Sequence, residues 1–311
     1  MSRSTDLMLT ALAPAVWGST YYVTTEWLPG WPPMTLALLR ALPAGLLLLA
    51  LVRRLPTRRQ WGPVLLLGTL NFALFWSLLF VAAQRLPGGV AATMGSAQAL
   101  LVLLLARGWL GTPLSAAAVA AALAGVAGVG LLVLGPAAAL DPLGLAAGVG
   151  SAAAMAAGTV LSRRWQGDTT PLTFTAWQLT AGGLVLLPVA LALEPAGPAL
   201  ELRHLGGLVY LGGLGAAVTY ALWFRGIARL GPSVTALLAL LSPVTAVAIG
   251  WALLDQHLST LQGVGALVVL ASVAVGQWVA SRPVGMRGSA PAPAGLPLAR
   301  AAVPGRSSTL I

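Results

Sequence analysis

Long apolar stretches alternate with short polar and proline-rich gaps along almost the whole chain. A transmembrane helix needs about 20 mostly apolar residues, and ten stretches meet this requirement. They are Leu7–Thr25, Pro33–Leu51, Trp61–Gln84, Gly88–Leu105, Leu114–Leu134, Leu143–Leu161, Leu172–Leu193, Leu205–Phe224, Ser233–Leu254 and Ser259–Ala280. This pattern predicts an all-α membrane protein with ten transmembrane helices.

Composition supports the same class. Of the 311 residues, 58% are hydrophobic and 8% are charged, against about 25% charged residues in an ordinary soluble domain. So few charges cannot cover a soluble surface. The net charge of +10 comes from arginines scattered between apolar runs, so we expect lipid and no nucleic acid as a partner. The chain has no cysteine, which excludes disulfides and thiolate metal sites.

The arginines also predict the orientation, because cytoplasmic loops of membrane proteins are rich in basic residues. With ten spans and a cytoplasmic N-terminus, fourteen arginines fall on the cytoplasmic side and two, Arg85 and Arg203, on the outer side. Arg40 alone lies well inside a span. We therefore expect a multi-pass protein of the cell inner membrane with both termini in the cytoplasm.

The two halves of the chain resemble each other. Residues 61–115 align without a gap with residues 205–259, at an offset of 144, with 14 identities in 55 positions. Pro33 and Gly45 match Pro171 and Gly183 at an offset of 138. Five spans per half is an odd number, so the halves enter the membrane from opposite sides. We predict two inverted five-helix repeats around a central cavity; simple duplication without transport is the alternative.

This division predicts three parts of the chain. Residues 1–137 form the first five-helix repeat, residues 138–281 form the second, inverted repeat, and residues 282–311 form a cytoplasmic tail. The tail is rich in proline and arginine and has no apolar period. We expect it to be disordered, because it has too little apolar surface to bury.

Several motifs resemble one transporter family. Trp17-Gly18-Ser19-Thr20 lies in the first span, Pro33 to Arg40 begins the second, and Leu241-Ser242-Pro243-Val244 precedes Leu254-Asp255 near the end. Their order over about residues 7–280 resembles the EamA family of the drug/metabolite transporter superfamily. The resemblance implies a secondary transporter without a cofactor, similar to the YddG-type amino-acid exporters, that moves small metabolites by alternating access.

Eight polar or aromatic residues inside the spans are candidates for binding the substrate. Arg40 could hold a substrate carboxylate through its planar guanidinium group, or it could reach the headgroups or tie helix ends together. Its partner at the offset of 138 is Gln178, and Trp76 pairs with Tyr220 at the offset of 144. The candidates, each of which could instead serve packing, are Trp17, Arg40, Asn71, Trp76, Gln98, Trp177, Gln178 and Tyr220.

Other function classes fit the sequence less well. A membrane metalloprotease needs His-Glu-x-x-His, whereas His204 and His257 are far apart, so we expect no enzyme and no metal site. A potassium-type filter sequence is missing, which leaves a channel as the weaker alternative. Amino acids or similar amphipathic solutes are the expected substrates, and drugs or sugar-like metabolites are the alternative. The sequence does not fix the oligomeric state, and a monomer is compatible with it.

Overall fold

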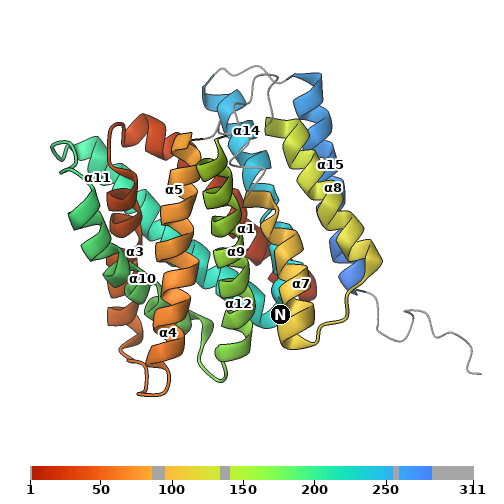
Figure 1. The fold of residues 1–311 in the computed structure, drawn as a ribbon, viewed down its shortest axis with the longest axis horizontal. Helices are drawn as coiled ribbons and strands as arrows, with labels where there is room; N and C mark the ends of the chain where they lie inside the picture. Colours follow the sequence, from red (N-terminus) through yellow and green to blue (C-terminus); the bar gives the residue numbers. More distant parts are fainter. Residues whose placement is uncertain (1, 86–94, 134–140, 255–258, 282–311) are drawn as a thin grey trace, which may run out of the picture. The chain divides into compact units, whose positions relative to one another are not determined.

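The computed structural model describes residues 2–85, 95–133, 141–254 and 259–281, and these residues form helices and no strand (Figure 1). The elements are α1 (Arg3–Gly18), α2 (Thr20–Tyr22), η1 (Val23–Trp27), α3 (Pro33–Val52), α4 (Trp61–Gly68), η2 (Thr69–Leu74), α5 (Phe75–Arg85), α7 (Gln98–Leu110), α8 (Ala116–Val133), α9 (Pro142–Trp165), α10 (Pro171–Leu193), α11 (Leu202–Val209), η3 (Tyr210–Val218), α12 (Thr219–Leu230), α13 (Pro232–Leu238), α14 (Leu241–Leu253) and α15 (Thr260–Ser281). The prefix η marks π-helical segments.

Seven of the predicted spans appear as helices that are long and apolar enough to cross a membrane. They are Pro33–Val52, Trp61–Leu79, Pro142–Trp165, Pro171–Leu193, Leu202–Leu230, Pro232–Leu253 and Thr260–Val279. Large side chains on their outer faces are exposed, as lipid contact requires; Leu47 of α3 and Leu267 of α15 are 64% and 68% exposed. The prediction of an all-α membrane protein is therefore confirmed.

The remaining three predicted spans differ in form. The first, Leu7–Thr25, is divided into α1, α2 and η1. The fourth overlaps the shorter apolar helix Gln98–Leu110, which continues past its predicted end, and the fifth contains the shorter apolar helix Ala116–Leu131. Part of the fourth predicted span and the tail 282–311 lie outside the described residues.

Prolines and small polar residues begin the helices where the sequence changes from gap to apolar run. Pro33, Pro142 and Pro171 are the first residues of α3, α9 and α10, a position where the missing N–H of proline does no harm. Asp141 accepts a hydrogen bond from the Gly144 N–H at 2.7 Å and so caps α9. These local signals explain why the observed helices begin close to the predicted spans.

Helices α3 and α10 pack against each other along their length and lie on the same side of the view as α11 and α4 (Figure 1). Close approach depends on two glycines. A Cβ atom added to Gly45 would lie 2.7 Å from Thr180 Oγ1, and one added to Gly183 would lie 2.7 Å from Leu42 Cβ. Small residues allow helix backbones to approach closely in membranes, so these glycines hold this helix pair together.

Two spans share an uncommon interruption. The third predicted span runs as α4, η2 and α5, and the eighth runs as α11, η3 and α12. The offset of 144 places η2, Thr69–Leu74, onto the second part of η3, Tyr210–Val218. π-Helical turns are rare and frequently occur at functional sites. Both interruptions lie beside the α3–α10 pair, since η3 packs on α3 and η2 on α10.

Candidate substrate site

An aromatic cluster connects α1, η2, α5 and α12. The Tyr220 ring lies 4.8 Å from the Trp17 ring, 4.8 Å from Phe72 and 6.1 Å from Trp76, measured between centroids. Trp17 is also 5.0 Å from Trp223. Such tilted and edge-on contacts are the favourable geometries for aromatic pairs. The rings of Phe72, Trp76, Tyr220 and Trp223 are buried, so the cluster forms one apolar and polarisable part of the helical core.

Arg40 places its positive charge on this cluster. Its Cζ atom lies 5.1 Å from the centroid of the Trp76 ring, within the range of a cation–π interaction. Its Nη2 atom donates to the Gly215 carbonyl at 2.7 Å. The guanidinium is therefore held on the backbone of η3. It carries the fixed positive charge of the site, because arginine keeps its proton in proteins.

Thr219 links Trp17 to the carbonyl that holds Arg40. Its Oγ1 accepts from Trp17 Nε1 at 2.9 Å and donates to the Gly215 carbonyl at 2.8 Å. Trp17, Thr219, Gly215 and Arg40 thus form a continuous hydrogen-bonded chain. Sequence analysis missed Gly215, because a backbone carbonyl has no signal in the sequence; the break in helical pattern around Gly212-Gly213 was the available clue.

Asn71 and Gln178 form a second polar contact, buried between η2 and α10. Asn71 Nδ2 donates to Gln178 Oε1 at 2.7 Å and to Ser162 Oγ at 3.2 Å. Both amides are 0% exposed. A Cβ on Gly158 would meet the Asn71 side chain, so the glycine makes room for it. The Asn71–Gln178 contact corresponds to the Gly215–Arg40 contact in the other half of the chain. The offset of 138 relates Arg40 to Gln178, and the offset of 144 relates Asn71 to Gly215.

The last two candidates lie elsewhere. Trp177 is buried among Val64, Leu67 and neighbouring apolar residues, and its Nε1 donates to the Arg54 carbonyl at 2.6 Å. Gln98 is the first residue of α7, and its Nε2 is buried with no hydrogen-bond partner among the described residues. Of the eight candidates, the structure thus brings together Trp17, Arg40, Trp76 and Tyr220 in one cluster, and Asn71 and Gln178 in another.

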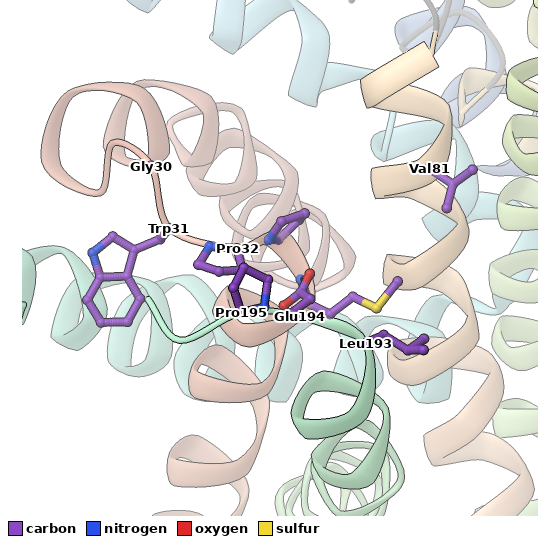
Figure 2. A pocket seen from close by; sticks show the side chains of 9 residues that line it. Gly30, Trp31, Pro32, Val81, Leu193, Glu194 and Pro195 are labelled. Atoms are coloured by element: carbon purple, nitrogen blue, oxygen red, sulfur yellow. The ribbon is translucent and has the colours of Figure 1, made fainter. Parts of the chain in front are cut away.

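A cavity of about 500 Å³ lies where α3 begins and α10 ends (Figure 2). Glu194 contributes its carboxylate, which accepts from the Met34 N–H at 2.7 Å and from the Thr35 N–H and hydroxyl at 2.6 and 2.8 Å. A carboxylate at this place satisfies free N–H groups and the positive end of the helix dipole. Sequence analysis missed this cap, because Glu194 and Thr35 are 159 residues apart.

The described residues contain no cluster of three or more His, Cys, Asp or Glu side chains that could hold a metal ion. The two clusters bring together a fixed cation, aromatic rings and hydrogen-bonding groups inside a membrane protein. Such a set suits a small solute with a polar or anionic end and an apolar body.

Comparison with known proteins agrees with this description. The model of the EamA-like transporter family matches the chain twice, over residues 5–134 and 142–275. Protein PecM of Dickeya dadantii is 42% identical over 267 residues, which cover 85% of this chain and 90% of that protein. The inner membrane transporter YedA of Escherichia coli K12 is 28% identical over 278 residues, covering 83% and 86% of the two chains.

A further relative and a solved structure extend the comparison. The probable amino-acid metabolite efflux pump of Escherichia coli K12 is 26% identical over 287 residues, covering 87% of this chain and 93% of the pump. A crystal structure with a TM-score of 0.77 and 22% identity covers 90% of this chain and all of the other, which shows a shared fold. The chain belongs to the EamA-like transporter family of the drug/metabolite superfamily and is a multi-pass membrane transporter.

Proposed function

We propose that the protein exports small metabolites, amino acids or similar amphipathic solutes, across the inner membrane by alternating access. In this proposal two inverted five-helix repeats, residues 1–137 and 138–281, rock against each other around a site between them. The observation that carries the proposal is the Arg40 guanidinium, held by the Gly215 carbonyl and seated on Trp76 in a cluster of aromatic rings.

The contacts between the halves support the inverted repeat. Gly45 lies against Thr180 and Gly183 lies against Leu42, and the offset of 138 exchanges the members of these two contacts. A two-fold axis requires that each contact occurs twice with its two members exchanged, whereas two unrelated surfaces do not produce such a pair of contacts. The double match of the family model, with a break near residue 138, also fits this division.

The chemistry of the cluster supports the substrate class. A planar guanidinium binds a carboxylate through two parallel hydrogen bonds, and aromatic faces accept an apolar or aromatic side chain. Trp17, Arg40, Trp76 and Tyr220 would therefore hold a zwitterionic or acidic solute. Asn71 would line or support the same space from η2, and Gln178 from α10. We include Gln98 and Trp177 as more distant members of the proposed site.

The direction and orientation rest on separate arguments. The arginine distribution supports cytoplasmic N- and C-termini. One relative is an inner membrane transporter and another is described as an efflux pump for amino-acid metabolites, which supports export from the cytoplasm. We propose a small-molecule substrate and lipid as the only partners, and a monomer is sufficient for this mechanism.

A counterflow screen in liposomes tests the substrate class. Vesicles containing the purified protein are loaded with excess unlabelled amino acid, sugar or cationic drug, and the uptake of the labelled solute is followed. Uptake of acidic or zwitterionic solutes that falls on Arg40→Gln supports the proposal. Uptake restricted to drugs or sugars, insensitive to Arg40→Gln, would replace the proposed substrate class, and an ohmic ion current would favour a channel.

A further inference from the structure

One acidic residue ties the beginning of α1 to the end of α12. The Asp6 carboxylate accepts from Arg225 Nη2 at 2.6 Å and from Arg229 Nε at 2.8 Å. Asp6 is only 6% exposed. Each carboxylate oxygen thus has its own guanidinium partner, in the short charge-assisted geometry that makes such bonds strong.

The two helices also touch directly beside this ion-pair cluster. A Cβ atom on Gly226 would overlap Thr10, whose Oγ1 would lie 2.5 Å away. Thr10 is itself 0% exposed and donates its hydroxyl to the Asp6 carbonyl at 2.6 Å. The contact leaves no space for solvent between α1 and α12 at this level, so this end of the interface is closed.

A second ion pair joins α5 to the start of α9. Arg85 Nη1 lies 3.6 Å from Asp141 Oδ2, and the two side chains are 48% and 35% exposed. Asp141 also caps α9 through the Gly144 N–H. The N···O distance of this pair is longer, and its side chains are more exposed to solvent, than in the Asp6 cluster. Exposed pairs of this kind contribute little to stability.

The two ion pairs contain arginines that are equivalent in the internal repeat, and their acids lie near the start of the first helix of each half. Arg85 and Arg229 are equivalent at the offset of 144 and are among the identical residues of that alignment. Asp6 is the fourth residue of α1 and Asp141 is the N-cap of α9, so the offset of 138 places Asp6 three residues beyond Asp141. Each pair links one half of the chain to the other. In an inverted repeat such equivalent arginines lie on opposite sides of the membrane.

We propose that Asp6–Arg225–Arg229 and Asp141–Arg85 are the two gates of alternating access, one on each side of the membrane. This inference rests on the proposed function, because it requires inverted repeats and a transport cycle. The short, buried Asp6 cluster is the closed gate, and the long, exposed Asp141–Arg85 pair is the loosened gate. The structure thus corresponds to a state closed on the Asp6 side, and strengthening one pair accompanies weakening of the other.

Single cysteines in this cysteine-free chain can report each gate. Ala13 lies two turns beyond Asp6 on α1, and Ala147 lies within two turns of Asp141 on α9; they are 0% and 5% exposed. We would measure the rate at which a membrane-impermeant thiol reagent labels Ala13→Cys from the N-terminal side and Ala147→Cys from the opposite side. Asp6→Asn and Asp141→Asn are the matched gate variants, and Asn keeps the capping ability at position 141.

We expect Asp6→Asn to raise the labelling rate of Ala13→Cys about tenfold and to lower that of Ala147→Cys. A tenfold change lies within the usual range for coupling between two sites of one protein. Asp141→Asn should raise labelling of Ala147→Cys and keep Ala13→Cys protected. If Asp6→Asn does not fold, Arg229→Gln, which leaves Arg225 on Asp6, provides a milder opening of the same gate. Labelling rates that do not change, or that rise together at both reporters, would overturn the proposal.

The labelling experiment needs no known substrate, so the two proposals can fail separately. Reciprocal changes in labelling without counterflow of any solute would retain the gates and reject the proposed substrate class. Normal counterflow with unchanged labelling in both gate variants would reject the gates and leave the transporter intact.

Discussion

Gly45 of α3 and Gly183 of α10 occupy equivalent positions in the two halves, and each lies directly against the other's helix. Gly45 faces Thr180 and Gly183 faces Leu42, and the offset of 138 relates both the glycines and their partners. Each of the two helices therefore contributes the same glycine position and the same partner position to the contact. It places the α3–α10 pair at the centre of the proposed two-fold arrangement, next to the segments that hold Arg40 and Gln178.

Adding one methyl group at this contact should destabilise the protein. We expect Gly45→Ala or Gly183→Ala to cost about 1–3 kcal/mol through overpacking, although alanine is favoured over glycine in a helix interior by up to about 1 kcal/mol. The measurement is thermal unfolding in detergent. Gly263→Ala is the control, because a Cβ there meets no atom within 4 Å. Equal unfolding temperatures for Gly45→Ala and Gly263→Ala would contradict the close approach.

Arg40 should determine selectivity between solutes by charge. Arg40→Gln removes the guanidinium and should lower kcat/KM for acidic or zwitterionic solutes at least about tenfold, because a charge-assisted hydrogen bond contributes about 1.5–3 kcal/mol. Cationic solutes should be spared. Arg40→Lys keeps the charge and should lie between the two. A loss of the same size for every solute would show that Arg40 serves only the contact with Gly215.

Thr219 should stabilise the site through its hydroxyl group. Thr219→Val removes the acceptor for Trp17 and the donor to Gly215, which leaves a buried indole N–H without its partner. We expect a loss of about 1–3 kcal/mol in the free energy of unfolding. Thr219→Ser keeps the hydroxyl and should lose much less. Indistinguishable unfolding of the two variants would mean that the hydrogen-bonded chain does not contribute.

The Asp6 cluster should be insensitive to pH in the physiological range. Asp6 lies outside the predicted first span, and hydrogen bonding from Arg229, followed by Arg225, lowers the pKa of its carboxyl group below the ordinary value against the opposing effect of burial. The other described helical segments packed on α1, namely α2, η3, α13 and α14, carry no charged residue. Arg3 on α1 is the one further charge.

A lowered folded-state pKa means that the stabilisation is complete above the unfolded pKa of about 3.9. It is lost only as the pH falls below this value and through the folded pKa. The difference in unfolding temperature between the wild-type protein and Asp6→Asn should therefore stay constant from about pH 8 to 5 and shrink below about pH 4. A difference that already disappears between pH 7 and 5 would indicate that Asp6 takes up a proton in the folded state.

Much of the fold can be predicted from the sequence, because apolar length, proline at helix starts and arginine bias are local signals. Seven predicted spans correspond to membrane-length helices. The division of Leu7–Thr25 into α1, α2 and η1 could not be predicted, since the hydropathy of a span does not report its hydrogen-bond register. The π-helical segments η2 and η3 could not be predicted from the sequence for the same reason.

For the candidate site, some residues could be predicted from the sequence, whereas their hydrogen-bond partners could not. Arg40 could be selected because a charged side chain inside a span is costly unless it has a partner. Trp17, Trp76 and Tyr220 could be selected because they lie away from the span ends, where interfacial aromatics are found. Their partners could not be predicted, since Arg40 uses a backbone carbonyl 175 residues away. Trp177 satisfies the same selection rule, yet it donates to the Arg54 carbonyl at the other end of α3. A polar residue in the middle of a span can therefore be predicted to be buried. Its position in the sequence does not predict which other residues it contacts.

Trans-stimulation in proteoliposomes distinguishes carrier-type transport by alternating access from diffusion through a channel. A labelled solute selected by the counterflow screen is preloaded, and its efflux is measured with and without the same unlabelled solute outside. A carrier that returns loaded moves faster than an empty one, so we predict saturable efflux that external solute accelerates. Arg40→Gln should lower this efflux at least about tenfold for acidic or zwitterionic solutes. Efflux that rises linearly with concentration and does not respond to external solute would contradict the account.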